Sequence, residues 1–280
     1  YGGGLRNSGL AIVQRSDILT NTATGGGAYR YGGDGDGGGV SSPGSLEFVH
    51  GVVRANLAQG TAATLEYAGS AEGGGINSRG ALTLTGSVIS ANVARGATGA
   101  VAGNGDAGGV CAVGRLRIEN STLADNQALG GAGTYWAYGK VGGDATGGAL
   151  YSYAFGGIEH IVISSTFSNN IAVGGTGESA GDADAGGVFS YYTLTIQNSL
   201  IYSNAAIGGL STANGSGGDA AGGGAYGLGD LTLRVSTVLS NTARGGNGNG
   251  YSSGGNGGGG GVFESYNGAI RIERALLLSN

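Results

Sequence analysis

The 280-residue sequence contains one cysteine, one proline and no methionine. The single cysteine, Cys111, excludes an intrachain disulfide, so the fold must hold without covalent cross-links. The single proline, Pro43, and glycines that follow no three-residue period exclude a collagen triple helix. Because methionine and a signal-peptide pattern are both missing, we expect Tyr1 to follow from processing or excision rather than from a translational start.

Charged residues are also scarce. They make up 11% of the chain, with 13 basic residues and a net charge of −5. The basic residues are scattered and form no patch, which argues against a nucleic-acid partner. No apolar run approaches the roughly 20 residues that cross a bilayer, so no membrane-spanning segment is expected. Disorder is disfavoured as well, since it usually couples low hydrophobicity with high net charge.

What the chain has in excess is glycine, 67 residues in all, and a repeat that runs through it. Motifs such as "SANVA" and "LSNTA" recur with separations of 35, 36, 34, 44, 34, 37 and 39 residues. Such periods are the signature of stacked repeats. The motifs place asparagines at Asn21, Asn56, Asn92, Asn126, Asn170, Asn204, Asn241 and Asn280.

Apolar residues stand at fixed distances before each asparagine. Positions three and eight residues earlier are always apolar, and position ten departs once, at His160. Positions eight and ten share the two-residue alternation of a strand. The odd spacing between eight and three requires a bend, which the small residue five places before the asparagine can occupy.

A third strand is predicted to start at paired glycines such as "GGGV" and "GGAL". Its fourth position is apolar in every unit and is expected to face the core. These residues are Leu5, Val40, Ile76, Cys111, Leu150, Phe189, Ala225 and Val262.

These patterns predict an all-β fold, a right-handed parallel β-helix of about eight rungs in one domain, 1–280. Each rung would have three short strands and one long glycine-rich loop. Equivalent asparagines would form a hydrogen-bonded amide ladder, because a buried amide without a partner is costly. The loops, all on one side, would pack on one another as a second layer.

The pairing of Gly147-Gly148-Ala149-Leu150 with Phe167-Ser168-Asn169-Asn170 resembles the repeats of chlamydial polymorphic outer-membrane proteins and related bacterial autotransporter passengers. The resemblance extends over the whole chain as a repeat consensus. It implies an extracellular or cell-surface location and a structural or adhesive role.

Acidic residues close most of the long loops, and they are the candidate metal ligands. They include Asp36, Asp106, Asp144, Asp184 and Asp219. Stacked carboxylates repel one another, and Ca²⁺ would relieve that repulsion. The alternative is that each aspartate caps its own turn and faces water. No other cofactor is expected.

Two further sets of residues are candidates for a functional role. Glu159 and His160 are neighbours, but no third catalytic partner is visible, so His160 is expected to be a satisfied structural histidine and the protein not an enzyme. Tyr135, Trp136 and Tyr138 lie in one loop, where exposed aromatic side chains would contact a glycan or host protein or would cover the glycine layer.

Glycine-framed rungs continue to both limits of the sequence with no capping pattern. Uncapped rungs expose strand edges, which favour association. We therefore expect a segment of an extracellular filament or surface fibre that stacks end to end with identical copies. The competing hypotheses are an adhesin passenger that binds through its loops and, third, a polysaccharide-degrading β-helix enzyme.

Overall fold

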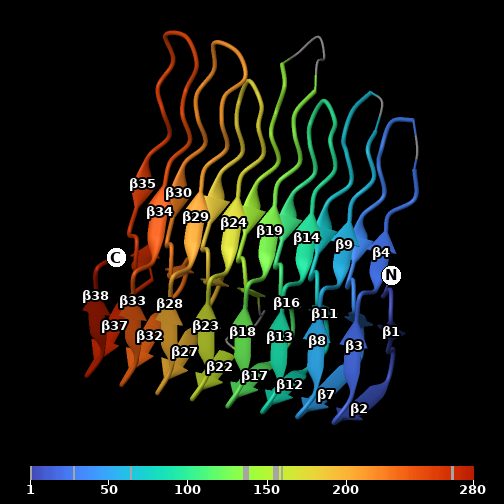
Figure 1. The fold of residues 1–280 in the computed structure, drawn as a ribbon, viewed down its shortest axis with the longest axis vertical. Helices are drawn as coiled ribbons and strands as arrows, with labels where there is room; N and C mark the ends of the chain where they lie inside the picture. The colour runs from blue at the N-terminus through green and yellow to red at the C-terminus, as the bar shows by residue number, and fades with distance from the viewer. Residues whose placement is uncertain are drawn as a thin grey trace.

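The computed structural model describes residues 2–27, 29–63, 65–134, 139–153, 158, 160–265 and 268–280. In these ranges the regular elements are all β-strands, and they form five parallel sheets. Each strand pairs with the strand five places later in chain order, as β1 does with β6. The predicted parallel β-helix is therefore confirmed, with about seven turns and a partial eighth stacked in sequence order (Figure 1).

The sheets are numbered here by the order of their strands in the first turn. Sheet 1 contains β1 (Leu5–Arg6), β6 (Val40–Ser42), β11 (Ile76–Ser78), β16 (Val110–Ala112), β21 (Leu150–Ser152), β26 (Val188–Ser190), β31 (Ala225–Gly227) and β36 (Val262–Glu264). Sheet 2 contains β2 (Leu10–Gln14), β7 (Ser45–Val49), β12 (Leu82–Thr85), β17 (Leu116–Glu119), β22 (His160–Ile163), β27 (Leu194–Gln197), β32 (Leu231–Arg234) and β37 (Ile270–Glu273). Sheet 3 contains β3 (Asp17–Leu19), β8 (Val52–Arg54), β13 (Val88–Ser90), β18 (Thr122–Ala124), β23 (Thr166–Ser168), β28 (Leu200–Tyr202), β33 (Thr237–Leu239) and β38 (Leu276–Leu278).

The remaining two sheets are narrower and have no member in the eighth turn. Sheet 4 contains β4 (Thr22–Thr24), β9 (Leu57–Gln59), β14 (Val93–Arg95), β19 (Gln127–Leu129), β24 (Ile171–Val173), β29 (Ala205–Ile207) and β34 (Thr242–Arg244). Sheet 5 contains β5 (Gly35–Asp36), β10 (Ala71–Glu72), β15 (Gly105–Asp106), β20 (Ala145–Thr146), β25 (Ala183–Asp184), β30 (Ala220–Ala221) and β35 (Gly257–Gly258).

Each full turn thus has the three predicted strands and two further short ones, five in all. Sheets 4 and 5 were missed because their strands are two or three residues long and face inward with alanine or glycine. Such segments lack the apolar alternation by which a strand is recognised. They pair all the same, because each has an equivalent neighbour one turn away.

The core has two compartments. Sheets 1, 2 and 3 enclose a continuous column of aliphatic and phenylalanine side chains, among them the fully buried Phe48, Leu84 and Phe167. Sheets 4 and 5 enclose only small side chains, such as Ala128, which lies with Ala145 in one cluster of buried alanines. An alanine stands two residues after each of the first seven repeated asparagines, and it is small because sheets 4 and 5 approach closely there.

In two turns, the residue of sheet 1 that faces the core differs from the predicted one. Val110 and Val188, not Cys111 and Phe189, occupy the core-facing column. In these turns an alanine with positive φ, Ala107 or Ala185, replaces the glycine that begins the motif elsewhere. The glycine pair therefore identifies the strand start one residue too late. Cys111 and Phe189 consequently face sheet 5.

The eight repeated asparagines form the predicted ladder, called the inner ladder below. In each turn the backbone N–H and the side-chain Nδ2 both donate to the Oδ1 of the next asparagine, as from Asn92 to Asn126 at 3.1 and 3.0 Å. The same Nδ2 also donates to a carbonyl of the preceding turn, Val53 in this case, at 2.9 Å. Asn92 and Asn126 are fully buried, so their polar atoms depend on these partners.

The long loops also stack, as predicted, and project from one side of the solenoid (Figure 1). Each loop has an outgoing and a returning limb, and a hydrogen-bonded zigzag joins them from loop to loop. Gly143 donates to Gly131 of its own loop at 3.0 Å, and Gly175 of the next loop donates to Gly143 at 2.8 Å. We call this second sheet of backbone the glycine layer.

Glycine is required there because neighbouring loops touch backbone to backbone. A Cβ on Gly143 would lie 2.0 Å from the carbonyl oxygen of Gly103, and one on Gly181 would lie 2.0 Å from that of Gly143. The same contact recurs at Gly69, Gly103, Gly218 and Gly255. Glycine content that looks like a flexible linker thus permits an ordered layer.

The inner ladder gives the first prediction. In Asn126→Ala, the backbone N–H and Nδ2 of Asn92 lose their shared acceptor and stay buried. We expect a loss of about 1–3 kcal/mol in unfolding free energy for each unpaired group. Urea unfolding followed by circular dichroism measures this loss. Asn247→Ala, which changes an exposed asparagine, should leave the midpoint unchanged, and equal effects of the two variants would contradict the ladder's role.

The glycine layer gives the second prediction. Gly143→Ala should destabilise the protein by about 1–3 kcal/mol, because its Cβ would overlap the Gly103 carbonyl. Gly26→Ala is the matched control, since nothing lies within 4 Å of the added carbon. That variant should gain about 0.4–1 kcal/mol through the unfolded state. Thermal melts of both variants test the opposite signs, and stabilisation by Gly143→Ala would refute the close approach.

Candidate functional site

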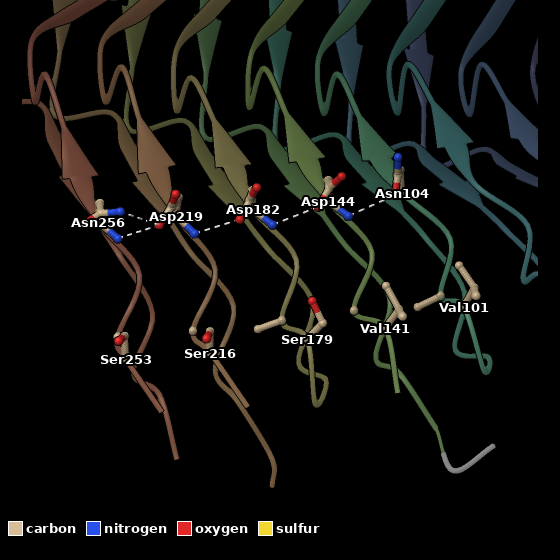
Figure 2. A pocket seen from close by; sticks show the side chains of 15 residues that line it. Val101, Asn104, Val141, Asp144, Ser179, Asp182, Ser216, Asp219, Ser253 and Asn256 are labelled. Carbon is tan, nitrogen blue, oxygen red and sulfur yellow. Dashed lines mark hydrogen bonds between the residues drawn. The ribbon is translucent and has the colours of Figure 1, made fainter. Parts of the chain in front are cut away.

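A groove of about 540 Å³ runs along the returning limbs of the loops, across turns three to seven. One wall is a line of polar side chains, and the other is formed by the residues three places earlier in the chain. Figure 2 shows the two lines, with the polar side chains nearer the strands. The groove is lined by equivalent positions of five successive loops.

The polar wall is a second ladder, called the outer ladder. Its members are Asp34, Ser70, Asn104, Asp144, Asp182, Asp219 and Asn256. Each side-chain oxygen accepts a hydrogen bond from the backbone N–H of the next member. For example, the Asp182 backbone N–H donates to Asp144 Oδ1 at 2.8 Å (Figure 2). This direction is opposite to that of the inner ladder. In the described contacts the second carboxylate oxygen of Asp144, Asp182 and Asp219 receives no hydrogen bond.

The opposite wall, called the outer line, changes in character along the rod. It consists of Tyr31, Tyr67, Val101, Val141, Ser179, Ser216 and Ser253. The residue after each of these is glycine or alanine and forms the groove floor. Its backbone N–H donates to the carbonyl of the outer line one turn on, as from Gly142 to Ser179 at 2.8 Å. The backbone N–H groups of the floor are thereby engaged in stacking.

This site has a sequence signature that is separate from the asparagine repeat. Four consecutive positions read outer-line residue, glycine or alanine, glycine, and then aspartate, asparagine or serine, as in Ser179-Ala180-Gly181-Asp182. All seven complete turns obey it. The signal was hidden because glycine is so common that a pattern of two glycine-like positions carries little weight by itself.

A second line of acidic residues lies on sheet 5 and faces sheet 1. Asp36, Glu72 and Asp106 are register neighbours in successive turns, and Asp184 follows two turns later. Arg79 lies 3.6 Å from Asp36 and 3.5 Å from Glu72, and Asn77 donates to Glu72 at 3.1 Å. Burial, and then the neighbouring Glu72, raise the pKa of Asp106 to about 7. Asp106 therefore exchanges its proton near neutrality.

The space between sheets 5 and 1 becomes aromatic toward the C-terminus. Tyr151 stacks on Phe189 with ring centroids 5.2 Å apart, and Phe189 meets Tyr226 edge to face at 5.2 Å. Phe189 and Tyr226 are buried. A hollow of about 160 Å³ next to this stack is lined by Glu72, Asp106, Cys111, Val113, Tyr151 and Tyr153. The aromatic stack fills the corner where the second acidic line gives way to small residues.

The predicted calcium ligands do not form one line. Asp36, Asp106 and Asp184 belong to sheet 5, whereas Asp144 and Asp219 belong to the outer ladder. The two lines are offset by two residues in the chain. Aligning the repeats on their paired glycines does not separate these two positions, so their acidic residues were grouped together. No group of three or more histidine, cysteine or acidic residues in the described ranges is placed to hold a metal ion. Calcium dependence stays a prediction.

Two of the remaining candidate residues, His160 and Cys111, lie in the part of the chain that the structure describes. His160 is buried, and its Nε2 lies 2.9 Å from the Gly114 carbonyl oxygen, as expected for a satisfied histidine. Burial lowers its pKa. Cys111 is buried as predicted, and burial raises its pKa. Tyr135, Trp136, Tyr138 and Glu159 lie outside the described residues.

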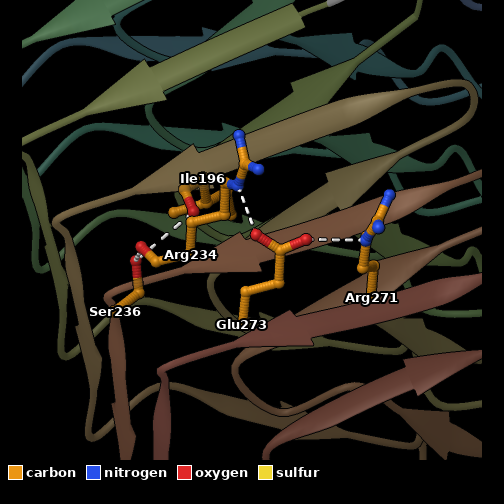
Figure 3. A network of polar contacts seen from close by, with 5 residues as sticks. All are labelled: Ile196, Arg234, Ser236, Arg271 and Glu273. Atoms are coloured by element: carbon orange, nitrogen blue, oxygen red, sulfur yellow. Dashed lines mark hydrogen bonds and ion pairs between the residues drawn. The ribbon is translucent and has the colours of Figure 1, made fainter.

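A charged network occupies the outer face of sheet 2 near the last turns. Glu273 accepts from Arg234 at 2.6 Å and from Arg271 at 2.7 Å (Figure 3). The hydrogen bond from Arg234 is the main reason that the pKa of Glu273 is lowered. Nearby, Ser236 donates to the Arg234 carbonyl at 2.8 Å within the bend of its turn. The network is exposed and links neighbouring turns, so it is a surface feature of the stack.

Comparison with known proteins gives no relative: no family model, no curated protein and no solved structure matches the chain. Among the described residues there is also no helix with the length and apolar character needed to span a membrane.

The raised pKa of Asp184 on sheet 5 gives a pH prediction. Burial, followed by Asp182, raises the pKa of Asp184 to about 7, so the folded state holds a proton that the unfolded state releases near pH 4. Stability should therefore fall as the pH rises from 4 to 7 and then level off. Asp184→Asn should remove this loss and stabilise the protein at pH 8 by up to about 4 kcal/mol, at about 1.4 kcal/mol per pH unit.

Chemical denaturation at pH 4 and pH 8 measures the difference. At pH 4 the variant and the unmodified protein should agree closely. Asp17→Asn, which changes an exposed position of β3, is the control and should leave the stability nearly unchanged. An Asp184→Asn variant that is less stable at pH 8 would show that the carboxylate is stabilised, not penalised, in this corner.

Proposed function

We propose that this chain is a rod segment of an extracellular or cell-surface fibre, in which rungs stack end to end. The observation that carries the proposal is the similarity of the end turns to the inner turns. At one end Asn21 Oδ1 receives no hydrogen bond from the described residues, and at the other the backbone N–H of Asn280 has no described acceptor. A further rung offers both missing partners.

The apolar columns support the same proposal. Core-facing residues such as Leu84 and Val238 are fully buried in the inner turns, but Ile272 and Leu277 of the last turn are 47% and 40% exposed. Exposed strand edges with apolar side chains pair readily with another chain unless they are blocked. No proline or inward-facing charge blocks β37 or β38. A copy of the same rod, or further turns of the same solenoid, would cover them.

The extracellular location is supported by the resemblance of the repeat to bacterial surface proteins, and the structural role by the glycine layer. The two ladders and the layer of backbone hydrogen bonds link each turn to the next without a disulfide. Adhesion through Tyr135, Trp136 and Tyr138 remains the alternative, and neither catalysis nor calcium is part of the proposal.

The test is electron microscopy and analytical ultracentrifugation of the purified chain over a range of concentrations. We expect rods that lengthen in multiples of one segment as the concentration rises. Leu277→Lys places a charge in the core-facing column of the last turn and should leave single short rods. Leu276→Lys is the matched control, because its side chain points outward, and it should still assemble. Short rods at every concentration for the unmodified chain would refute assembly by stacking.

A further inference from the structure

The groove between the outer ladder and the outer line has a shape that suits an extended polymer. It crosses five turns without interruption, and its floor residues, such as Ala102, Gly142 and Ala180, have at most a methyl group. Parallel strands repeat about every 4.8 Å, so equivalent positions on the groove walls recur at that interval. A ligand that uses the whole groove must itself be linear and repeating.

The functional groups on the groove walls determine which kind of polymer can bind. In the last three turns the outer line contributes a serine and the outer ladder contributes the residue three places later, so that Ser216 and Asp219 line the same groove (Figure 2). One carboxylate oxygen of Asp182 and Asp219 is engaged by the next turn, so the other is open to a hydroxyl donor. Burial raises the pKa of Asp182. A row of hydroxyl groups and carboxylate acceptors matches a polyhydroxylated chain.

Two other linear polymers fit poorly. The lining contains no lysine or arginine, and three aspartates contribute negative charge, so polyanions such as nucleic acids or acidic polysaccharides would be repelled. A bound peptide strand needs unpaired backbone groups at a sheet edge. Here the floor donates its N–H groups to the next turn. The spacing of a peptide strand, about 3.3 Å per residue, also differs from that of the turns.

An aromatic pair extends the outer line toward the first turns. Tyr31 and Tyr67 are more than half exposed and stack with centroids 6.1 Å apart and planes 7° apart. Exposed aromatic faces provide apolar contact area for ligands, with a hydroxyl at the edge. They lie in the same register as Val101 and Val141, on the same side of the loops. We propose that a linear, non-acidic polysaccharide binds lengthwise in this groove, held by the serine and aspartate rows and covering the tyrosine pair.

The experiment measures binding of neutral β-1,4-linked glucose hexamer by isothermal titration calorimetry, with a polygalacturonate hexamer as the acidic probe. We expect saturable binding of the neutral probe and none of the acidic one. Ser216→Trp should abolish binding by filling the groove, whereas Ser90→Trp, on the outer face of β13, should bind like the unmodified chain. The triple change Ser179→Ala, Ser216→Ala and Ser253→Ala should weaken binding by at least about tenfold.

Circular dichroism melts of each variant confirm that the solenoid is intact. Asp182→Asn keeps the Oδ1 acceptor of the ladder and should fold, since asparagine already serves this role at Asn104. It should weaken binding by less than Ser216→Trp does. Three outcomes would overturn the proposal: no saturation with the neutral hexamer or its mannose and chitosan counterparts, tighter binding of the acidic hexamer, or full binding by Ser216→Trp.

Discussion

The whole structure depends on one constraint, that equivalent residues of successive turns lie about one strand spacing apart and must satisfy each other. A polar side chain at such a position is stable only if its copies above and below complete its hydrogen bonds. The inner ladder meets this requirement with one residue type in all eight turns. Because the amide both donates and accepts, asparagine continues the row, and a turn that lacked it would leave buried groups unpaired on both sides.

The same constraint explains why so much glycine coexists with order. In a loop that faces water, glycine raises the entropy of the unfolded chain and lowers stability. Here the returning limb of one loop lies against the next with its backbone, so any side chain at Gly143 or Gly181 would overlap a carbonyl oxygen. The lost entropy is offset by the continuous zigzag of hydrogen bonds through the layer. Composition alone therefore misleads, and the position of glycine within the repeat is the informative quantity.

The core-facing columns and the inner ladder were predictable from the sequence, because Asn92, Ile89 and Leu84 repeat at fixed offsets that a glycine-rich background cannot imitate. Sheets 4 and 5 were not, since segments such as Ala145–Thr146 have too few residues to show a period. Cys111 was assigned to the wrong face because alanine can replace glycine at a positive-φ corner, which Ala107 demonstrates. The groove was missed for a related reason: its aspartates, asparagines and serines substitute for one another in the outer ladder, and only the shared acceptor oxygen is constant.

The opposite directions of the two ladders have a consequence for any contact between rungs. At every boundary between turns the inner ladder donates forward along the chain, as from Asn92 to Asn126, while the outer ladder donates backward, as from Asp182 to Asp144. A rung that approaches in the same orientation supplies an acceptor to the first ladder and a donor to the second. A rung that approaches head to head would set acceptors against acceptors in one ladder and donors against donors in the other. If rods assemble as we propose, the ladders favour head-to-tail over head-to-head stacking, and a head-to-tail contact does not close on itself.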